Sequence, residues 1–399
     1  MKASGTISKP KRILAIDVFR ALTMFFMIFV NDLFTLTGVP KWLEHTTIHE
    51  DGMGFSDVIF PLFLFIVGLS IPLAITIRMR KQESKPTILG HILLRTLALL
   101  VMGFYMVNYE NIYDGAMGFS KRIWCILMAT AIFLVWLEYR RLPGIGLLRA
   151  WTLRLAGMGL LGYLAWAYRG GSAGSIVGMQ PYWWGILGLI GWAYLFNSLL
   201  YVLFRKRVGY LIAVFFVLLF MNIQEKGFFE GLPRLKMLIS ASNYILVMAG
   251  MLCCQFYLKY RKTTRSLNAY FIGVLLLGVL WVALGFGIRP YFPISKNLAT
   301  PSWMLICMGI GLWTFVLLYL IVDRLGYTGW ASSIKPAGTS TLTCYLMPYF
   351  IYPALGLLGV QWPHFLSHGI VGLGKALLFS LVIILFVGVL ERRDIRLRV

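Results

Sequence analysis

Apolar residues in this chain are gathered into blocks of about 20 that alternate with short polar connections, and about 20 residues is the length a helix needs to cross a bilayer. Apolar residues make up 59% of the 399 residues and charged residues 13%, with a mean hydropathy of +0.78. A soluble domain of this length would need more polar residues to cover its surface. The sequence therefore predicts an all-α fold, a polytopic membrane helix bundle.

Twelve blocks are predicted as spans. They lie near residues 13–33, 57–77, 91–109, 122–138, 151–168, 182–204, 208–222, 241–259, 267–288, 301–322, 338–358 and 370–390. The block at 208–222 is short, and the block at 338–358 contains Pro348 and Pro353, which a membrane helix tolerates where neighbouring groups satisfy the freed carbonyl. We expect about 10–12 transmembrane helices.

Lys and Arg cluster in alternate connections, and acidic residues lie in the others. The basic connections include residues 78–85, 205–207 and 259–265, and the acidic ones hold Glu44, Glu50, Asp51, Glu110, Asp114, Glu225 and Glu230. Basic connections face the cytoplasm. We therefore predict a cytoplasmic tail at 1–12, a membrane domain at 13–390 and a second cytoplasmic tail at 391–399.

The net charge of +22 resides in these short connections between spans, which argues against a nucleic-acid partner. The first apolar block is too long for a removable signal peptide and lacks a small-residue cleavage site, so we expect it to remain as a signal anchor. The five cysteines fall inside apolar blocks without metal-ligand spacing, which predicts neither a disulfide framework nor a metal site.

Charged residues near the membrane are the first candidates for function, because a charge inside a bilayer is costly. Asp17 and Arg20 lie three residues apart on one helical face, either as an interfacial ion pair or as a contact to a ligand that enters from the cytoplasm. Asn31 and Asp32 close the same helix, where they either cap it or face a cavity.

The loop at 41–52 concentrates two of the chain's five histidines, His45 and His49, with three carboxylates. A neutral imidazole is the usual general base for an amine or hydroxyl nucleophile, and a nearby carboxylate can orient it. The alternative is a solvated polar loop in which Ser56 or Asp57 caps the following helix. Lys296 and Asn297, just before a later span, are typical of an interfacial anchor.

Four segments taken together resemble the heparan-α-glucosaminide N-acetyltransferase family, as a bacterial member that consists of the membrane domain. They are IDVFRALTMFFMIFVND, HTTIHEDGMGFSDVIFPLFLFIVGLSIPLAI, PISKNLATPSW and PAGTSTLTCYL. The resemblance implies a transmembrane acyltransferase, dimeric and in the bacterial inner membrane. It would move an acetyl group from cytoplasmic acetyl-CoA to a glycan or amino-sugar acceptor on the opposite side.

The resemblance also implies roles for individual residues. Asn31 would polarise the thioester carbonyl, Asp57 would orient the histidine, and His45 would act as base or as transient acyl carrier, with His49 as the alternative histidine. Contacts to acetyl-CoA are expected at Asp17, Arg20, Arg122, Asn243, Lys296 and Asn297. We favour His45 because Trp-Leu-Glu precedes it, as in the family.

The sequence also departs from the family pattern. In the family the pattern His-Ala-x-Trp-x-Gly precedes the aspartate that corresponds to Asp57, whereas the segment before Asp57 is longer here. We also expect no large external domain ahead of the first span and two additional spans within 151–222, so that heparan sulfate is not the expected acceptor. The other functions considered are a secondary transporter, to which the interrupted span at 338–358 would be suited, and a non-catalytic envelope scaffold.

Overall fold

The computed structural model describes residues 13–224, 241–261 and 264–399. Its α-helices are α1 (Leu14–Asp32), α2 (Ser56–Arg80), α3 (Lys85–Glu110), α4 (Lys121–Trp136), α5 (Leu147–Ala167), α6 (Gly185–Phe204), α7 (Val208–Ile223), α9 (Ser242–Tyr260), α10 (Thr264–Gly287), α11 (Pro301–Leu318), α12 (Lys335–Thr339), α13 (Thr341–Leu346), α14 (Pro348–Leu357) and α15 (Gly369–Arg392). The strands β1 (Gly170–Ser172) and β2 (Ser175–Val177) form a short antiparallel hairpin. The all-α prediction is confirmed.

Each of the twelve predicted spans falls on helix. Among the described residues, seven helices are long and apolar enough to cross a membrane: α1 with its 3₁₀ extension, α2, α3, α6, α10, α11 with its π-helical extension, and α15. The helices at the other predicted spans are shorter or less apolar, α7 among them. The chain is therefore a multi-pass bundle, and the total of ten to twelve spans stays a prediction.

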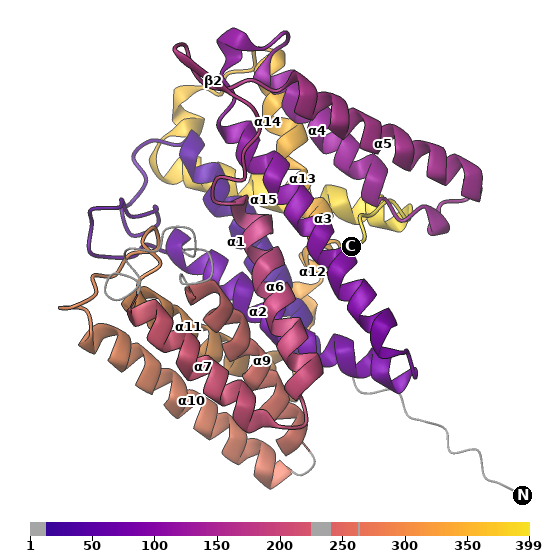
Figure 1. Cartoon of the computed structure of the whole chain (residues 1–399). Coiled ribbons are helices and arrows are strands. Elements are labelled where there is room, and N and C mark those ends of the chain that lie inside the picture. The colour runs from indigo at the N-terminus through magenta and orange to yellow at the C-terminus, as the bar shows by residue number, and fades with distance from the viewer. Residues whose placement is uncertain (1–12, 225–240, 262–263) are drawn as a thin grey trace, which may run out of the picture.

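Helices pack in pairs around a centre made by α1 and α2. Residue contacts join α2 to α9, α3 to α6, α10 to α11 and α4 to α5. In Figure 1, α7, α9, α10 and α11 gather on one side of the bundle, and α4 with α5 stands on the other. Glycine permits the closest approach, between α2 and α9, where a Cβ on Gly68 would strike the Val247 carbonyl and one on Gly250 the Phe65 carbonyl.

The predicted span at 338–358 is not one helix. It is built from α12, α13 and α14, which break at Ser340 and again at Met347 before Pro348. A proline removes one backbone donor and clashes with the preceding turn, so a break here follows from the sequence. The three pieces pack against α1, α4 and α15, which leaves irregular backbone inside the protein rather than against lipid.

The predicted tail at 391–399 is part of the folded structure. Arg396 Nε lies 2.8 Å from Glu138 Oε2, and Arg398 Nη1 lies 2.6 Å from Glu138 Oε1. Leu397 pairs with Leu137 through a β-bridge. The segment is therefore held against the connection between α4 and α5. The predicted tail at 1–12 and the acidic residues Glu225 and Glu230 lie outside the described residues.

Candidate functional site

The loop before α2 folds back over the start of that helix and brings His45 to Asp57. His45 Nδ1 lies 2.7 Å from Asp57 Oδ1. The Asp57 side chain is 1% exposed, whereas that of His45 is 46% exposed. The carboxylate therefore lies inside the protein, and the ring it holds faces outward.

The second oxygen of Asp57 fixes the loop itself. Oδ2 accepts hydrogen bonds from the Thr46 backbone N–H at 3.1 Å, the Thr46 hydroxyl at 3.0 Å and the Gly54 N–H at 3.0 Å. The backbone carbonyl of Asp57 accepts from Trp303 Nε1 at 3.1 Å. A buried carboxylate requires such donors, and here they leave Oδ1 for the imidazole. Asp57 is thus more than a helix cap.

This geometry sets the tautomer of His45. A neutral imidazole carries one N–H, and a carboxylate beside Nδ1 holds the proton on that nitrogen. Nε2 is then left as a lone-pair acceptor on an exposed ring. A histidine in this state can take a proton from a nucleophile, and the resulting cation is stabilised by Asp57.

Lys296 lies beside the pair. Its Nζ is 3.1 Å from His45 Nδ1 and 3.8 Å from Asp57 Oδ1. With the Nδ1 proton directed to Asp57, Nδ1 has no lone pair for Lys296, so the ammonium acts here as a charge beside the Asp57 carboxylate. Burial lowers the pKa of Lys296 below its usual range, although the Asp57 carboxylate opposes that shift. The structure thus places Lys296 beside the histidine, and its predicted contact to acetyl-CoA stays a prediction.

Asn297 lies in the same segment and fixes the histidine loop, since its Nδ2 donates to the Thr46 carbonyl at 3.1 Å. The two loops are joined again at Asp51, which accepts from Arg289 Nε at 2.9 Å and from the Ile294 N–H at 2.7 Å. The Arg289 hydrogen bond and then the Ile294 bond hold the pKa of Asp51 below its usual range. Sequence analysis missed this pairing because the loops lie more than 230 residues apart.

The two histidines of the loop differ in their surroundings. His45 lines a cavity of about 520 Å³, which we call the histidine cavity, and His49 is exposed and does not line it. The neighbouring Glu50 accepts from the Thr47 N–H at 2.9 Å. The structure therefore brings His45, and not His49, together with Asp57.

Asn31 also lines the histidine cavity, from the end of α1. Its neighbour Asp32 is buried, with Lys375 Nζ 3.2 Å from its Oδ2 and the Tyr352 hydroxyl 2.6 Å from its Oδ1. The ion pair joins the end of α1 to α15, and the hydrogen bond from Tyr352 joins it to α14. Lys375 was not predicted, although a lysine within the last apolar block is the signal that would have found it.

The rest of the histidine cavity is aromatic and acidic. Its walls include the carboxylates Glu44 and Glu110 and the aromatic residues Phe34, Tyr109, Trp183, Tyr345, Tyr349 and Tyr352. Aromatic side chains offer flat apolar faces and, in Tyr and Trp, a hydrogen-bonding tip. Such a cavity suits a ligand that has both apolar faces and polar edges.

A second cavity, of about 790 Å³, opens toward the opposite ends of the helices, and we call it the basic cavity. Its lining holds one aspartate, Asp17, and five arginines: Arg20, Arg80, Arg95, Arg261 and Arg398. Arginine guanidinium groups bind phosphate oxygens in bidentate geometry. The cavity therefore suits a phosphorylated ligand.

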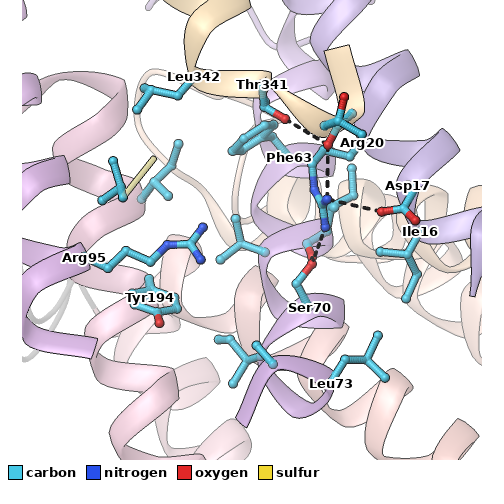
Figure 2. Close-up of a pocket in the computed structure, with 18 of the residues that line it drawn as sticks. Ile16, Asp17, Arg20, Phe63, Ser70, Leu73, Arg95, Tyr194, Thr341 and Leu342 are labelled. Carbon is cyan, nitrogen blue, oxygen red and sulfur yellow. Dashed lines mark hydrogen bonds and ion pairs between the residues drawn. The ribbon is translucent and has the colours of Figure 1, made fainter. Parts of the chain in front are cut away.

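Figure 2 shows Arg20 and Arg95 on opposite walls of the basic cavity. Arg20 Nη2 donates to the Ser70 hydroxyl at 2.9 Å, and its Nη1 lies 3.4 Å from Asp17 Oδ1. The Arg95 guanidinium lies 4.8 Å from the ring centroid of Tyr194. The predicted pair Asp17 and Arg20 is thus both an ion pair and part of a cavity wall.

Two predicted contacts to acetyl-CoA lie elsewhere. Arg122 is exposed at the start of α4, with its side chain beside Gly356, and Asn243 lies in the first turn of α9. Neither residue lines the basic or the histidine cavity. Within the described part of the chain, no three His, Cys, Asp or Glu side chains are grouped as a metal site requires.

Comparison with known proteins gives relatives for part of the chain. Human heparan-alpha-glucosaminide N-acetyltransferase is 33% identical over 112 residues, which is 28% of this chain and 16% of the human protein. The mouse protein of the same name is 34% identical over 115 residues, 29% of this chain and 16% of its own length. The chain resembles this acetyltransferase family. The match spans about a sixth of those relatives, and no protein-family model matches the chain.

Proposed function

We propose that this chain is a transmembrane acyltransferase that moves an acetyl group from cytoplasmic acetyl-CoA to the amine of a sugar on the opposite side of the membrane. The observation that carries the proposal is the His45–Asp57 pair at the wall of one cavity, with an arginine-lined cavity leading to it from the other end of the bundle. A base for the acceptor and a site for the donor's phosphates then lie on one path.

The two ends of this path lie a membrane's thickness apart. Asp57 lies in the first turn of α2 and Arg80 is its last residue, so about 24 residues at 1.5 Å each separate Ser56 from Arg80 by roughly 36 Å. The arginine end would face the cytoplasm, in keeping with the basic register of the connections. The histidine end would face the acceptor, in the bacterial inner membrane.

In the proposed reaction the acceptor ammonium first releases one proton to solvent, and the neutral nitrogen then attacks the thioester carbonyl. A C–N bond forms, the C–S bond breaks, and the proton lost by the nitrogen passes to Nε2 of His45. The departing sulfur takes up a proton and leaves as the CoA thiol. Asp57 stabilises the imidazolium that forms, and Asn31 donates a hydrogen bond to the developing oxyanion, a contribution of roughly 3–4 kcal/mol where it has been measured in other enzymes.

The lining of the histidine cavity supports a sugar acceptor. Flat aromatic faces such as Trp183 and Tyr349 can cover a pyranose ring, while Glu44 and Glu110 can accept from its hydroxyl and ammonium groups. The acidic residues favour a cationic amine over a neutral hydroxyl as the group brought into the cavity. The resemblance to an N-acetyltransferase family agrees with this choice.

The experiment is a transfer assay with purified protein in nanodiscs, supplied with acetyl-CoA and glucosamine. We expect N-acetylglucosamine and free CoA thiol to appear in equal amounts, and a rate of transfer lower by about 10²–10⁴-fold with Asp57→Asn. Hydrolysis of acetyl-CoA without an acetylated sugar would overturn the proposed acceptor. Failure of folded protein to bind acetyl-CoA would favour a transporter or a scaffold. The molar mass of the purified protein in detergent, before it is placed in nanodiscs, tests the proposed homodimer.

A further inference from the structure

The basic cavity and the histidine cavity meet at two residues. Among the described residues, only Ile186 in the first turn of α6 and Tyr345 in α13 line both cavities. Tyr345 is 9% exposed, and its ring lies 6.1 Å from that of Tyr349 in the wall of the histidine cavity. These two residues therefore form a shared wall between the two cavities.

The change from one cavity to the other occurs at a corresponding place in the neighbouring elements. On α1, Met27 lines the basic cavity and Val30, one turn further, lines the histidine cavity. Along α13 and α14, Leu342 lines the basic cavity and Pro348 lines the histidine cavity, with Tyr345 between them. The boundary between the two cavities thus lies at a single level of the bundle.

This level lies close to the histidine end. On α2 the lining of the basic cavity extends from Arg80 to Phe63, so 17 residues at 1.5 Å each give a depth of about 25 Å. The hydrocarbon of a bilayer is about 30 Å thick. A donor that enters the basic cavity would therefore cross most of the membrane before it meets Ile186 and Tyr345.

The position of Ile186 is fixed by the turn that precedes it. Trp184 and Gly185 both have left-handed backbone, with φ of 69° and 64°. A Cβ on Gly185 would lie 3.0 Å from the Gly103 carbonyl, so α6 begins in close contact with α3. Only glycine adopts this backbone readily at such a contact. The first turn of α6, and with it Ile186, is thus packed directly against α3.

We propose that Ile186 and Tyr345 form a partition that separates the two cavities and restricts the acyl groups that reach His45 to small, unbranched ones. This specificity role rests on the proposed function. In that function the acyl group is at the end of the donor's thioester arm and is the first part of the donor to reach Ile186 and Tyr345. The partition excludes acyl groups that are wider than the pantetheine arm of CoA. An acetyl group is no wider than this arm and passes, whereas a branched or aromatic acyl group is wider and does not.

The first experiment measures transfer from acetyl-CoA, isovaleryl-CoA and benzoyl-CoA. Ile186→Ala and Tyr345→Ala should each raise the ratio of isovaleryl to acetyl transfer at least tenfold, while Tyr345→Phe, which keeps the ring, should leave it unchanged. Ile190→Ala is the matched control, because Ile190 lies one turn along α6 and lines the basic cavity alone. An unchanged ratio in both alanine variants, or an equal rise in Ile190→Ala, would overturn the selection.

The second experiment tests the partition without any chemistry at His45. Thr341 lines only the basic cavity, so a cysteine at this position (Thr341→Cys) reports on access to it, with the unsubstituted protein labelled in parallel to give the background from native cysteines. In oriented proteoliposomes, an impermeant thiol reagent on the histidine side should fail to label this reporter. Combining it with Ile186→Ala and Tyr345→Ala should speed that labelling at least tenfold.

The two readouts separate the two ideas. Labelling of the reporter from the histidine side with Ile186 and Tyr345 intact, or no acceleration in the combined variant, would overturn the partition. Absence of transfer from every acyl-CoA would overturn the proposed function and the selection with it, while the labelling still decides whether the two residues separate the cavities.

Discussion

Asp57 Oδ1 lies 2.7 Å from Nδ1 of His45, and the aspartate is buried while the histidine is exposed. The carboxylate thereby fixes which imidazole nitrogen carries the proton and which can accept one. This relationship between two residues twelve positions apart is the basis of the catalytic role proposed for the histidine loop. The predictions that follow test that role, the donor site and the segment that adjoins it.

Asp57→Asn should lower acetyl transfer by about 10²–10⁴-fold, because an amide beside Nδ1 no longer selects the productive tautomer or stabilises the imidazolium. Binding of acetyl-CoA, measured by calorimetry, should be nearly unchanged. Asp51→Asn is the control, since Asp51 joins the same loops without touching the histidine. Comparable losses in the two variants would show that Asp57 acts only by holding the loop.

Arg95→Gln should weaken acetyl-CoA binding about 10–100-fold, the value of one charge-assisted hydrogen bond of roughly 1.5–3 kcal/mol to a phosphate. Arg122→Gln should leave binding unchanged, because Arg122 does not line the basic cavity. Titration calorimetry at two salt concentrations measures both effects. The reverse pattern would place the donor elsewhere and restore the role that the family resemblance gave to Arg122.

Glu138→Gln should destabilise the protein by about 2 kcal/mol at pH 7, the order of a hydrogen bond between charged groups. Burial raises the pKa of Glu138, but hydrogen bonds from Arg398 and Arg396 lower it more, so the net pKa lies below 4.5. The folded protein therefore prefers the carboxylate. This stabilisation is full above pH 4.5 and is lost as pH falls through the lowered pKa.

Thermal unfolding in detergent checks this sign. The difference between the parent and Glu138→Gln should be greatest near neutral pH and shrink below pH 4.5. Arg393→Gln, in the same segment, should show little difference at either pH. A difference that grows on acidification would contradict the pairing of Glu138 with the two arginines.

Thr47→Cys should react with an impermeant thiol reagent added to intact cells, because the loop at 34–56 is predicted to be external. The unsubstituted protein, labelled in the same way, gives the background from native cysteines. Reaction only after lysis would invert the topology and place the basic cavity on the outside.

The helices were predictable because apolar blocks of membrane length are a strong signal, and each predicted span falls on helix. The break at Pro348 was also visible in the sequence. The pairing of Lys296 with His45 was not, because a local pattern cannot show that the loop before α11 lies against the loop before α2. The pairing of Lys375 with Asp32 was not visible either, because the two residues lie 343 positions apart, although a lysine within the last apolar block could have been singled out as a candidate.

The family resemblance favoured His45 but left His49 as the alternative, and the geometry gives a second distinction between them. His45 lies in the cavity wall beside Asp57, while His49 faces outward a few residues later. Residue spacing could not show which histidine faces Asp57, because the loop is neither helix nor strand and its side chains follow no regular period. The preference for His45 remains a prediction about catalysis.

The most direct test is the rate of acetyl transfer to glucosamine by His45→Ala and His49→Ala, each in protein shown to bind acetyl-CoA. A surface substitution in this exposed loop should change stability by no more than about 0.5 kcal/mol, so rates can be compared in folded protein. We predict that His45→Ala loses about 10²–10⁴-fold in rate and that His49→Ala stays within a few-fold of the parent. Full activity in His45→Ala would contradict the role of His45 as the base, and with it the mechanism proposed for this chain.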